Sequence, residues 1–294
     1  MIKVIAADMD GTLLASNHMV SKKTEEIILK ACEKGYRFIV VTGRNFVSAL
    51  QALDLTNIKC DYIVSSGAQI RDCNKEIIKT IILPQEECEY LYRKIKKYNI
   101  GMMFCSEMEN YMLGTREEVD QGILNYIKYF HDTATKEELK ESPLYRLMWD
   151  KTKVFSSYEE MKKKGGEITK FFLVSENIEL LNKIKNEIEQ NKILAVSSSF
   201  KYNLEVTAYN AQKGPVLKEY IESLGYTMEE VMVFGDSLND YSMMEMDFGA
   251  TVAMANAEEE IKRIAKYETK SNDEDGVAYA IQEMLKMYEK KEDK

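Results

Sequence analysis

VIAADMDGT, residues 4–12, joins a short apolar run to a pair of aspartates. Val4–Ala7 has the length of a buried strand, and Asp8 and Asp10 follow directly at its end. Ligands of a parallel sheet collect at the carboxyl ends of its strands. Two carboxylates crowded at such an end are unfavourable unless a cation or a substrate uses them. The alternative is a plain turn, because Asp and Gly are common turn residues.

The residues around this stretch alternate between helical and strand patterns. Residues 21–34 carry apolar side chains at helical spacing, and Gly35 follows where a helix commonly ends. Residues 38–41, 46–53 and 62–64 are then expected to form a strand, a helix and a strand. The same alternation returns near the end of the chain, in residues 213–224, 231–234, 241–246, 249–253 and 276–288. This order predicts an α/β fold with a Rossmann-like parallel sheet and crossover helices.

The middle of the chain has a different pattern of predicted elements. Charged helices are expected at residues 86–98 and 178–190. Short strands are expected between and beside them, at residues 102–105, 111–113, 171–174, 194–196 and 204–206. Such mixed order is typical of an α+β domain. We therefore predict a core domain of residues 1–83 and 210–294, interrupted by an inserted cap domain of residues 84–209.

Composition excludes several classes of function. The chain has 294 residues, and 40 Lys and Arg against 49 Asp and Glu give a net charge of −9, which disfavours a nucleic-acid partner. A phosphorylated substrate remains compatible, because a bound divalent cation reverses the local field. Only two histidines, His18 and His131, are present, so a mechanism built on several histidines is excluded. The sequence does not specify an oligomeric state.

Targeting and redox signals point to the cytoplasm. The five cysteines are scattered without a C-x-x-C pair, so neither a zinc site nor a disulfide framework is indicated. Asp8 interrupts the N-terminal apolar run before a signal peptide is complete, and no run reaches the ~18 apolar residues of a membrane helix. We expect a soluble cytoplasmic protein with no membrane partner.

Two further segments suit an anionic ligand. Thr42-Gly43-Arg44 ends the second strand, where a hydroxyl and backbone amides can hold an anionic oxygen; an ordinary loop with a surface arginine is the alternative. Lys213 begins a helix, where a cation opposes the helix dipole unless an anion lies between them. A solvated surface lysine is the alternative there.

A fourth strand end brings more oxygen ligands. Gly235-Asp236-Ser237-Leu238-Asn239-Asp240 follows the strand at residues 231–234. Carboxylates suit Mg²⁺, which takes one or two of them together with waters and substrate phosphate. The alternative is a polar turn in which Asp240 caps the next helix.

The order of these four segments resembles the haloacid dehalogenase superfamily of phosphohydrolases. Its motifs read DxDGT, a Thr or Ser, a Lys, and GDxxND. Three further segments match: Ser66-Gly67-Ala68, VAMANA at residues 252–257, and SNDEDGVA at residues 271–278. The family usually has Asn where Ser66 stands. An insert of about 125 residues between the second and third motifs resembles the Cof-type branch with a type IIB cap.

The resemblance implies a role for each motif residue. Asp8 would be the nucleophile and Asp10 the general acid and base. The implied cofactor is Mg²⁺, held by Asp8, the Asp10 backbone carbonyl and Asp236. The remaining motif residues would bind phosphate (Thr42, Gly43 and Lys213) or support the site (Asn239, Asp240 and Arg44).

The implied activity is hydrolysis of small phosphorylated metabolites, with sugar phosphates as the class and the insert closing over the site. A sugar phosphomutase of the same superfamily is the runner-up, because it uses the same nucleophile. A non-catalytic module that binds phosphorylated metabolites is a third possibility, which the presence of Asp10 disfavours. A P-type pump is disfavoured by the lack of membrane spans, and by Asp10 where those pumps carry Thr.

Overall fold

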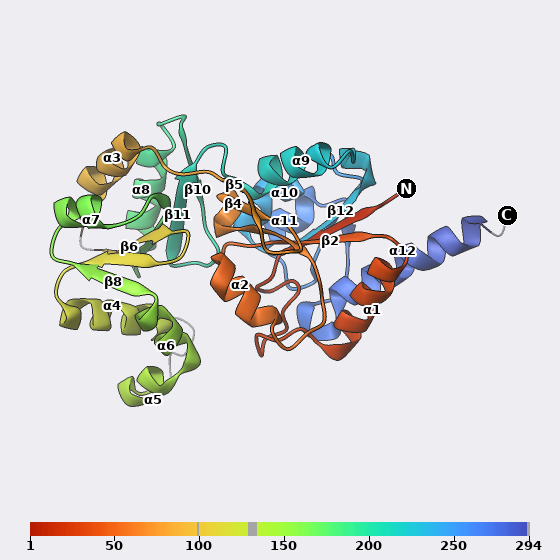
Figure 1. The fold of residues 1–294 in the computed structure, drawn as a ribbon, viewed down its shortest axis with the longest axis horizontal. Helices are drawn as coiled ribbons and strands as arrows, with labels where there is room; N and C mark the ends of the chain where they lie inside the picture. Colours follow the sequence, from red (N-terminus) through yellow and green to blue (C-terminus); the bar gives the residue numbers. More distant parts are fainter. Residues whose placement is uncertain (99, 129–133, 293–294) are drawn as a thin grey trace. The chain divides into compact units, whose positions relative to one another are not determined.

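The computed structural model describes residues 1–98, 100–128 and 134–292, so His131 lies outside the described residues (Figure 1). The chain forms two compact units. Residues 1–81 and 210–294 make up the first, here named the core unit. Residues 82–209 make up the second, here named the insert unit. Each unit is built around a sheet of its own.

The core unit contains the expected parallel sheet, with strand order β14-β13-β12-β1-β2-β3-β4-β5. The strands from β14 to β3 run parallel, whereas β4 and β5 are antiparallel to their neighbours. The strand bounds are β1 Val4–Ala7, β2 Arg37–Val41, β3 Asp61–Val64, β4 Gln69–Arg71, β5 Ile77–Thr80, β12 Val231–Gly235, β13 Ala250–Ala253 and β14 Tyr267–Glu268. The α/β class predicted from the sequence is confirmed.

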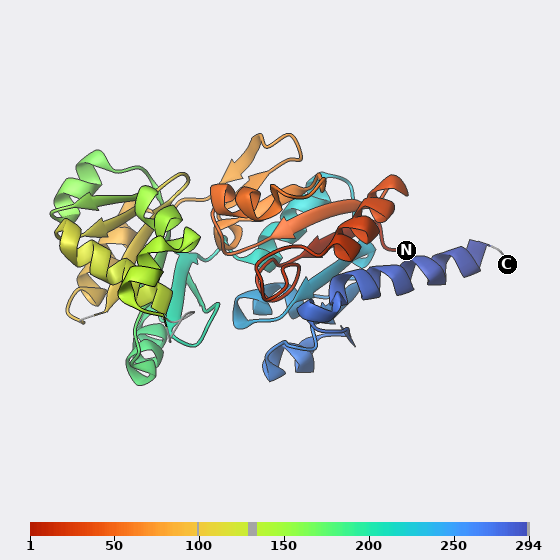
Figure 2. The ribbon, with the colours of Figure 1, turned by 90° about the horizontal axis from the view of Figure 1, so that it is seen from below.

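Helices flank this sheet, and their bounds are α1 Lys22–Glu33, α2 Phe46–Leu53, α9 Lys213–Ser223, α10 Tyr241–Met244, α11 Glu259–Ile264 and α12 Gly276–Glu292. The side chain of Ser21 caps α1 by accepting a hydrogen bond from the amide of Thr24. Helices α1 and α12 lie side by side, and α9 packs against α10 (Figures 1 and 2). Because helices follow the strands, the strand ends that carry the sequence motifs come together at one edge of the sheet.

The sequence did not predict β4, β5 or β14. Strands β4 and β14 are only three and two residues long, too short to show a period. Strand β5 is exposed or half-buried along its length, with Ile77 and Ile78 about half exposed, so it lacks the pattern of a buried strand. Strands β5 and β14 are the two edge strands of the sheet, where burial is incomplete, whereas β4 is buried between β3 and β5.

The insert unit is an α+β structure with strand order β10-β11-β9-β6-β7-β8. All its strand pairs are antiparallel except β7 with β8. The strands are β6 Gly101–Ser106, β7 Asn110–Leu113, β8 Thr152–Phe155, β9 Ile168–Val174, β10 Leu194–Ser197 and β11 Asn203–Ala208. The helices are α3 Gln85–Ile95, α4 Arg116–Lys128, α5 Lys136–Glu141, α6 Pro143–Asp150, α7 Tyr158–Lys164 and α8 Ile178–Ile188.

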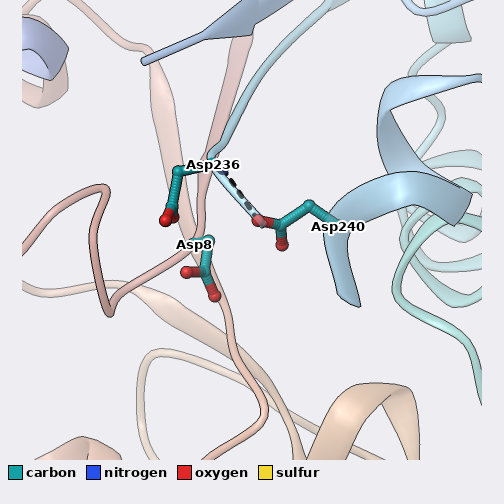
Figure 3. A group of neighbouring side chains, drawn as sticks. All are labelled: Asp8, Asp236 and Asp240. Atoms are coloured by element: carbon teal, nitrogen blue, oxygen red, sulfur yellow. Dashed lines mark hydrogen bonds between the residues drawn. The ribbon is translucent and has the colours of Figure 1, made fainter. Parts of the chain in front are cut away.

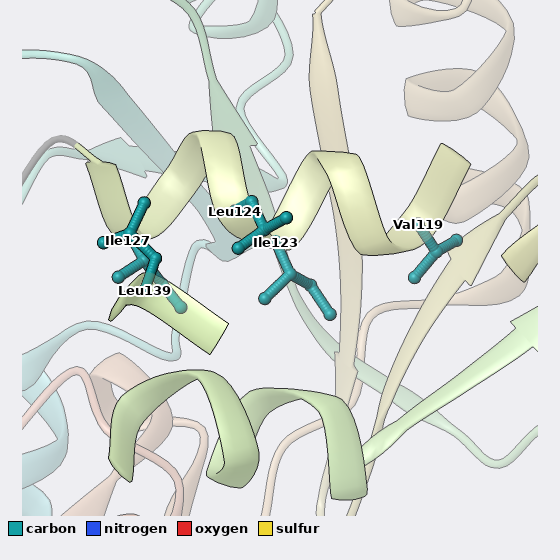
Figure 4. Close-up of a cluster of buried hydrophobic side chains, with 5 residues drawn as sticks. All are labelled: Val119, Ile123, Leu124, Ile127 and Leu139. Carbon is teal, nitrogen blue, oxygen red and sulfur yellow. The ribbon is translucent and has the colours of Figure 1, made fainter. Parts of the chain in front are cut away.

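A cluster of buried aliphatic side chains holds α4 and α5 together in the insert unit (Figure 4). Helix α4 contributes side chains at helical spacing, and α5 adds one more; the members are Val119, Ile123, Leu124, Ile127 and Leu139. Met112 of β7 and Val154 of β8 pack against this cluster. Burying each such side chain contributes about 1.5–3 kcal/mol, so the cluster fixes these helices to the sheet of the insert unit.

Among the described residues, no helix is both long enough and apolar enough to cross a bilayer. All five cysteines are free thiols, and three of them (Cys60, Cys88 and Cys105) are buried. Burial raises the pKa of the Cys60 thiol to about 12, so this side chain is an unreactive part of the core.

Candidate active site

Strand pairing in the core unit sets where the motif residues lie. Strand β1 pairs in parallel with β2 on one side and β12 on the other, with Ala7 level with Val40 and Phe234. The amide of Asp8 continues this pairing by donating to the carbonyl of Phe234 at 3.1 Å. Asp8 and Asp236 therefore emerge together from neighbouring strand ends.

Lys213 lies at the centre of the site, with a side chain only 1% exposed. Its Nζ donates to Oδ1 of Asp8 and to Oδ1 of Asp240, each at 2.6 Å. A longer contact of 3.3 Å reaches Oδ1 of Asn239. The lysine that the sequence placed at a helix start is thus a buried cation between two carboxylates, rather than a solvated surface side chain.

Asp8, Asp236 and Asp240 form a group in which one carboxylate oxygen of each lies within 4.8 Å of the others (Figure 3). Both oxygens of Asp240 are already engaged. Oδ1 accepts from Lys213, and Oδ2 accepts from the amides of Asp236 at 2.9 Å and Ser237 at 3.2 Å. Asp240 therefore orients its neighbours and is poorly placed to serve as a further metal ligand.

Asp240 is the N-cap residue of α10, the position that the alternative interpretation of the sequence gave it. Its side chain, however, makes no capping hydrogen bond to that helix. The carboxylate turns back instead to the turn that begins at Ser237. The charge of Lys213 explains this direction, because it attracts the carboxylate into the site.

The loop after β1 packs closely on Asp236. Gly11 has φ of +79°, and a Cβ atom there would lie 2.3 Å from Oδ2 of Asp236, so only glycine fits. The hydroxyl of Thr12 donates to Oδ1 of Asp236 at 2.7 Å. Thr12 is a site residue that the sequence reasoning missed, although it belongs to the quoted DGT segment.

Burial and mutual repulsion perturb the acids of this group. Burial, reinforced by Asp240 and partly opposed by Lys213, raises the pKa of Asp8 well above its usual range. Burial and the neighbouring Asp240 raise the pKa of Asp236 to about 7, although the Thr12 hydrogen bond works against this. For Lys213, burial lowers the pKa, but Asp240 and Asp8 outweigh that effect and raise it overall. Such perturbed groups are typical of functional sites.

Asp10 lies apart from the buried carboxylates and pairs with Arg44. The guanidinium donates from Nε to Oδ2 at 2.7 Å and from Nη2 to Oδ1 at 2.6 Å, while the Asp10 side chain is 50% exposed. The hydroxyl of buried Thr42 accepts from the amide of Arg44 at 3.1 Å, and Gly43 lies between them. The predicted residues thus fall into a buried lysine–carboxylate group and an exposed acid–arginine pair.

Two asparagines hold the loop after β1 from outside, and the sequence reasoning did not select them. Asn256 donates from its side chain to the carbonyl of Gly11 at 2.8 Å. The backbone amide of Asn272 donates to Oδ1 of Asn256 at 3.0 Å, and its side chain donates to the carbonyl of Leu14 at 2.9 Å. The only signal was their membership of the VAMANA and SNDEDGVA segments.

The donor set fits a hard divalent cation. Asp8 and Asp236 bring carboxylate oxygens from neighbouring strand ends, which are ligands that Mg²⁺ prefers. Because Gly11 has no side chain, the space next to Oδ2 of Asp236 is not filled by a Cβ atom.

The chain is similar to known proteins along nearly its whole length. The sequence pattern of the haloacid dehalogenase-like hydrolases matches residues 5–281. The Bacillus subtilis 5-amino-6-(5-phospho-D-ribitylamino)uracil phosphatase YcsE is 30% identical over 280 residues, covering 95% of this chain and 94% of the relative. A solved haloacid dehalogenase-like hydrolase from B. subtilis has a TM-score of 0.83 at 28% identity, covering 96% of this chain and 99% of that one. A subclass IIB sugar phosphatase has a TM-score of 0.73 at 27% identity, covering 96% and 98%.

The fold and the site therefore define a class: the chain belongs to the haloacid dehalogenase-like hydrolase family. Within this family it is a phosphatase of the Cof-type, IIB branch, as the sequence predicted. The match covers nearly the whole chain, so it includes the insert unit as well as the core unit.

Proposed function

We propose that this phosphatase hydrolyses small phosphorylated metabolites, with sugar phosphates as the substrate class, in a Mg²⁺-dependent reaction in the cytoplasm. The observation that carries the proposal is the buried contact of Lys213 with Asp8 and Asp240. A lysine held at this point favours the anionic form of Asp8, against the effect of burial, and adds positive charge where a phosphate must arrive.

Asp8 acts as the nucleophile in this proposal. Its carboxylate attacks phosphorus, the P–O bond to the leaving group breaks, and an aspartyl-phosphate forms. Lys213 fixes one oxygen of Asp8, and the other oxygen makes the attack. Thr42, Gly43 and Lys213 then hold the phosphoryl oxygens, since phosphoryl transfer relies mainly on positioning and electrostatic stabilisation.

Asp10 acts as the general acid and general base in this proposal. As an acid it gives a proton to the departing alkoxide, and as a base it then takes one from the water that cleaves the aspartyl-phosphate. Arg44 donates two hydrogen bonds to the Asp10 carboxylate and so fixes its direction. Asn239 and Asp240 position Lys213 through its remaining contacts.

Asp8, Asp236 and the backbone carbonyl of Asp10 would hold the metal. When bound, Mg²⁺ offsets the repulsion between an anionic nucleophile and an anionic phosphate. Thr12 and Gly11 keep Asp236 in place for this role through a hydrogen bond and close packing.

The insert unit would select the leaving group. A Bacillus subtilis relative is named for a substrate that carries a phosphoribityl chain, and a structural relative is named a sugar phosphatase. A panel of sugar phosphates, nucleoside monophosphates and phosphoamino acids, assayed for phosphate release, tests the substrate class. We expect sugar phosphates to give the highest kcat/KM; a preference for phosphoamino acids would contradict the proposal.

We expect Mg²⁺ binding to strengthen as the pH rises through about 7. The folded, metal-free protein holds a proton on Asp236 that the unfolded chain releases near pH 4. In the metal-free protein, the contribution of Asp236 to the free energy of unfolding therefore decreases as the pH rises from about 4 to 7. Mg²⁺ competes with that proton, so the rise in Tm caused by Mg²⁺ should be larger at pH 8 than at pH 6.

Two variants test the assignment of this effect to Asp236: one removes its carboxylate and the other is a control. In Asp236→Asn, both the Mg²⁺-induced rise in Tm and its pH dependence should largely disappear. Asp247→Asn changes an exposed acid paired with Lys266 and should leave both unchanged. Chelator-treated wild type should release no phosphate until Mg²⁺ is restored. Equal Tm shifts at the two pH values, or turnover without metal, would contradict the proposed metal site.

Asp10→Asn is expected to slow turnover by about 10²–10⁴-fold for each proton transfer that it removes. p-Nitrophenyl phosphate separates the two steps, because its leaving group needs no proton. With this substrate the variant should release one rapid equivalent of p-nitrophenol and then stall as aspartyl-phosphate. Stopped-flow absorbance measures the burst.

Labelled water separates the phosphatase from the mutase. In H₂¹⁸O, the wild type should place label in the released phosphate, because water attacks the aspartyl-phosphate at phosphorus. An isomeric sugar phosphate formed faster than free phosphate would instead establish the mutase. A wild-type rate retained by Asp10→Asn on sugar phosphates would remove Asp10 from the proton transfers.

A further inference from the structure

Three successive residues after β3 have an uncommon backbone conformation. Ser65, Ser66 and Gly67 have φ values of +52°, +62° and +102°. Positive φ is unfavourable for serine, and two adjacent serines in this region persist only where their surroundings hold them. All three residues are buried. The loop Ser65–Gly67, here named the β3 loop, is therefore held by its neighbours.

One neighbour is the segment that carries Thr42 and Arg44. The amide of Ser65 donates to the carbonyl of Arg44 at 2.7 Å, and the amide of Ser66 donates to the carbonyl of Thr42 at 3.0 Å. These bonds use the amides that the positive φ values turn toward the neighbouring loop. The backbone of the β3 loop thus fixes the residues proposed to bind phosphate on one side of the site.

The other neighbour is the segment just before Lys213. A Cβ atom on Gly67 would lie 2.8 Å from the carbonyl carbon of Gln212 and 2.9 Å from its oxygen. Both contacts are to backbone, which a rotamer change cannot relieve. The carbonyl of Gln212 also accepts from the amide of Val216 in the first turn of α9. Gly67 therefore sets how closely this segment approaches β3.

We propose that the β3 loop is a spacer whose residues position Thr42 and Lys213 relative to each other. Thr42 lies directly after β2 and Lys213 is the first residue of α9. The β3 loop packs on the backbone of both segments, at Thr42 and Arg44 on one side and at Gln212 on the other. The inference rests on the proposed function, in which these two residues share one phosphate. The residues of the β3 loop act through Thr42 and Lys213 and are therefore positioning residues.

Gly67→Ala tests the spacer, with Gly35→Ala as the matched control. Gly35 has φ of +90° but nothing within 4 Å of an added Cβ, so its substitution brings the same backbone penalty without a collision. Both variants should lower the Tm, and Gly67→Ala should lower it further, because the collision with Gln212 adds to the backbone penalty that the two share. Only Gly67→Ala should weaken inhibition by inorganic phosphate, by about tenfold or more, since misplacement of about 1 Å can cost 10²-fold in rate.

Hydrogen exchange on the wild type provides a measurement that does not depend on the variant folding. Inorganic phosphate with Mg²⁺ should slow exchange in the peptides containing Ser65, Ser66 and Val216 together. If phosphate inhibits the wild type but leaves the exchange of residues 65–66 unchanged, the spacer is wrong. Equal phosphate inhibition constants in Gly67→Ala and Gly35→Ala would also overturn it. A wild type that neither binds nor releases phosphate would instead refute the proposed function itself.

Discussion

Asp8→Asn is expected to reduce phosphate release by about 10⁴-fold or more, because an amide cannot attack phosphorus. The fold should survive the change. Asp8 is 2% exposed, and burial already raises the pKa of its carboxyl well above the usual range, so its charge is unfavourable there. Asp240 still pairs with Lys213 in the variant. We therefore expect a Tm equal to or above that of the wild type.

Phosphate release and thermal melting, measured on the same preparation without and with Mg²⁺, test this expectation. Aspartyl-phosphate should be trapped by acid quench in the wild type and absent in Asp8→Asn. Asp72→Asn changes a half-buried aspartate of the β4–β5 turn and should leave activity unchanged. Activity of Asp8→Asn within tenfold of the wild type would show that another group is the nucleophile.

The parallel sheet and its site were readable from the sequence because strand ends are local signals. Val4–Ala7 is apolar throughout and is followed at once by Asp8, so strand and ligand are adjacent in the chain. The same holds for β2 with Thr42 and for β12 with Asp236. Once a parallel sheet is expected, topology alone brings these ends together.

What the sequence did not reveal depends on contacts between distant residues. The hydrogen bond from Thr12 to Asp236 spans 224 positions, and the pair of Asp10 with Arg44 spans 34. Neither follows from a residue type or a period. The positive φ of Ser65 and Ser66 was equally hidden, because serine gives no local sign of such a conformation and only tertiary contacts impose it.

Lys213→Met is expected to remove activity and to destabilise the protein by about 3–5 kcal/mol at neutral pH, because it leaves buried carboxylates without their cation. Methionine keeps most of the volume of the side chain, so the loss of charge dominates. Without the ammonium group, the pKa of Asp8 should rise further. Protonation then relieves the repulsion in acid, so the destabilisation relative to wild type should be smaller at pH 5 than at pH 8.

Lys218→Met on the same helix is the matched control. Lys218 is 45% exposed and lies 3.9 Å from Glu222, so its loss should change stability by no more than about 0.5 kcal/mol. Urea unfolding at pH 5 and pH 8, with phosphate release on the same samples, measures both effects. If Lys213→Met were as stable as Lys218→Met at pH 8, the buried ion pairs would contribute nothing to the fold. If it also kept its turnover, Lys213 would have no part in binding phosphate, because the variant has no positive charge at this position.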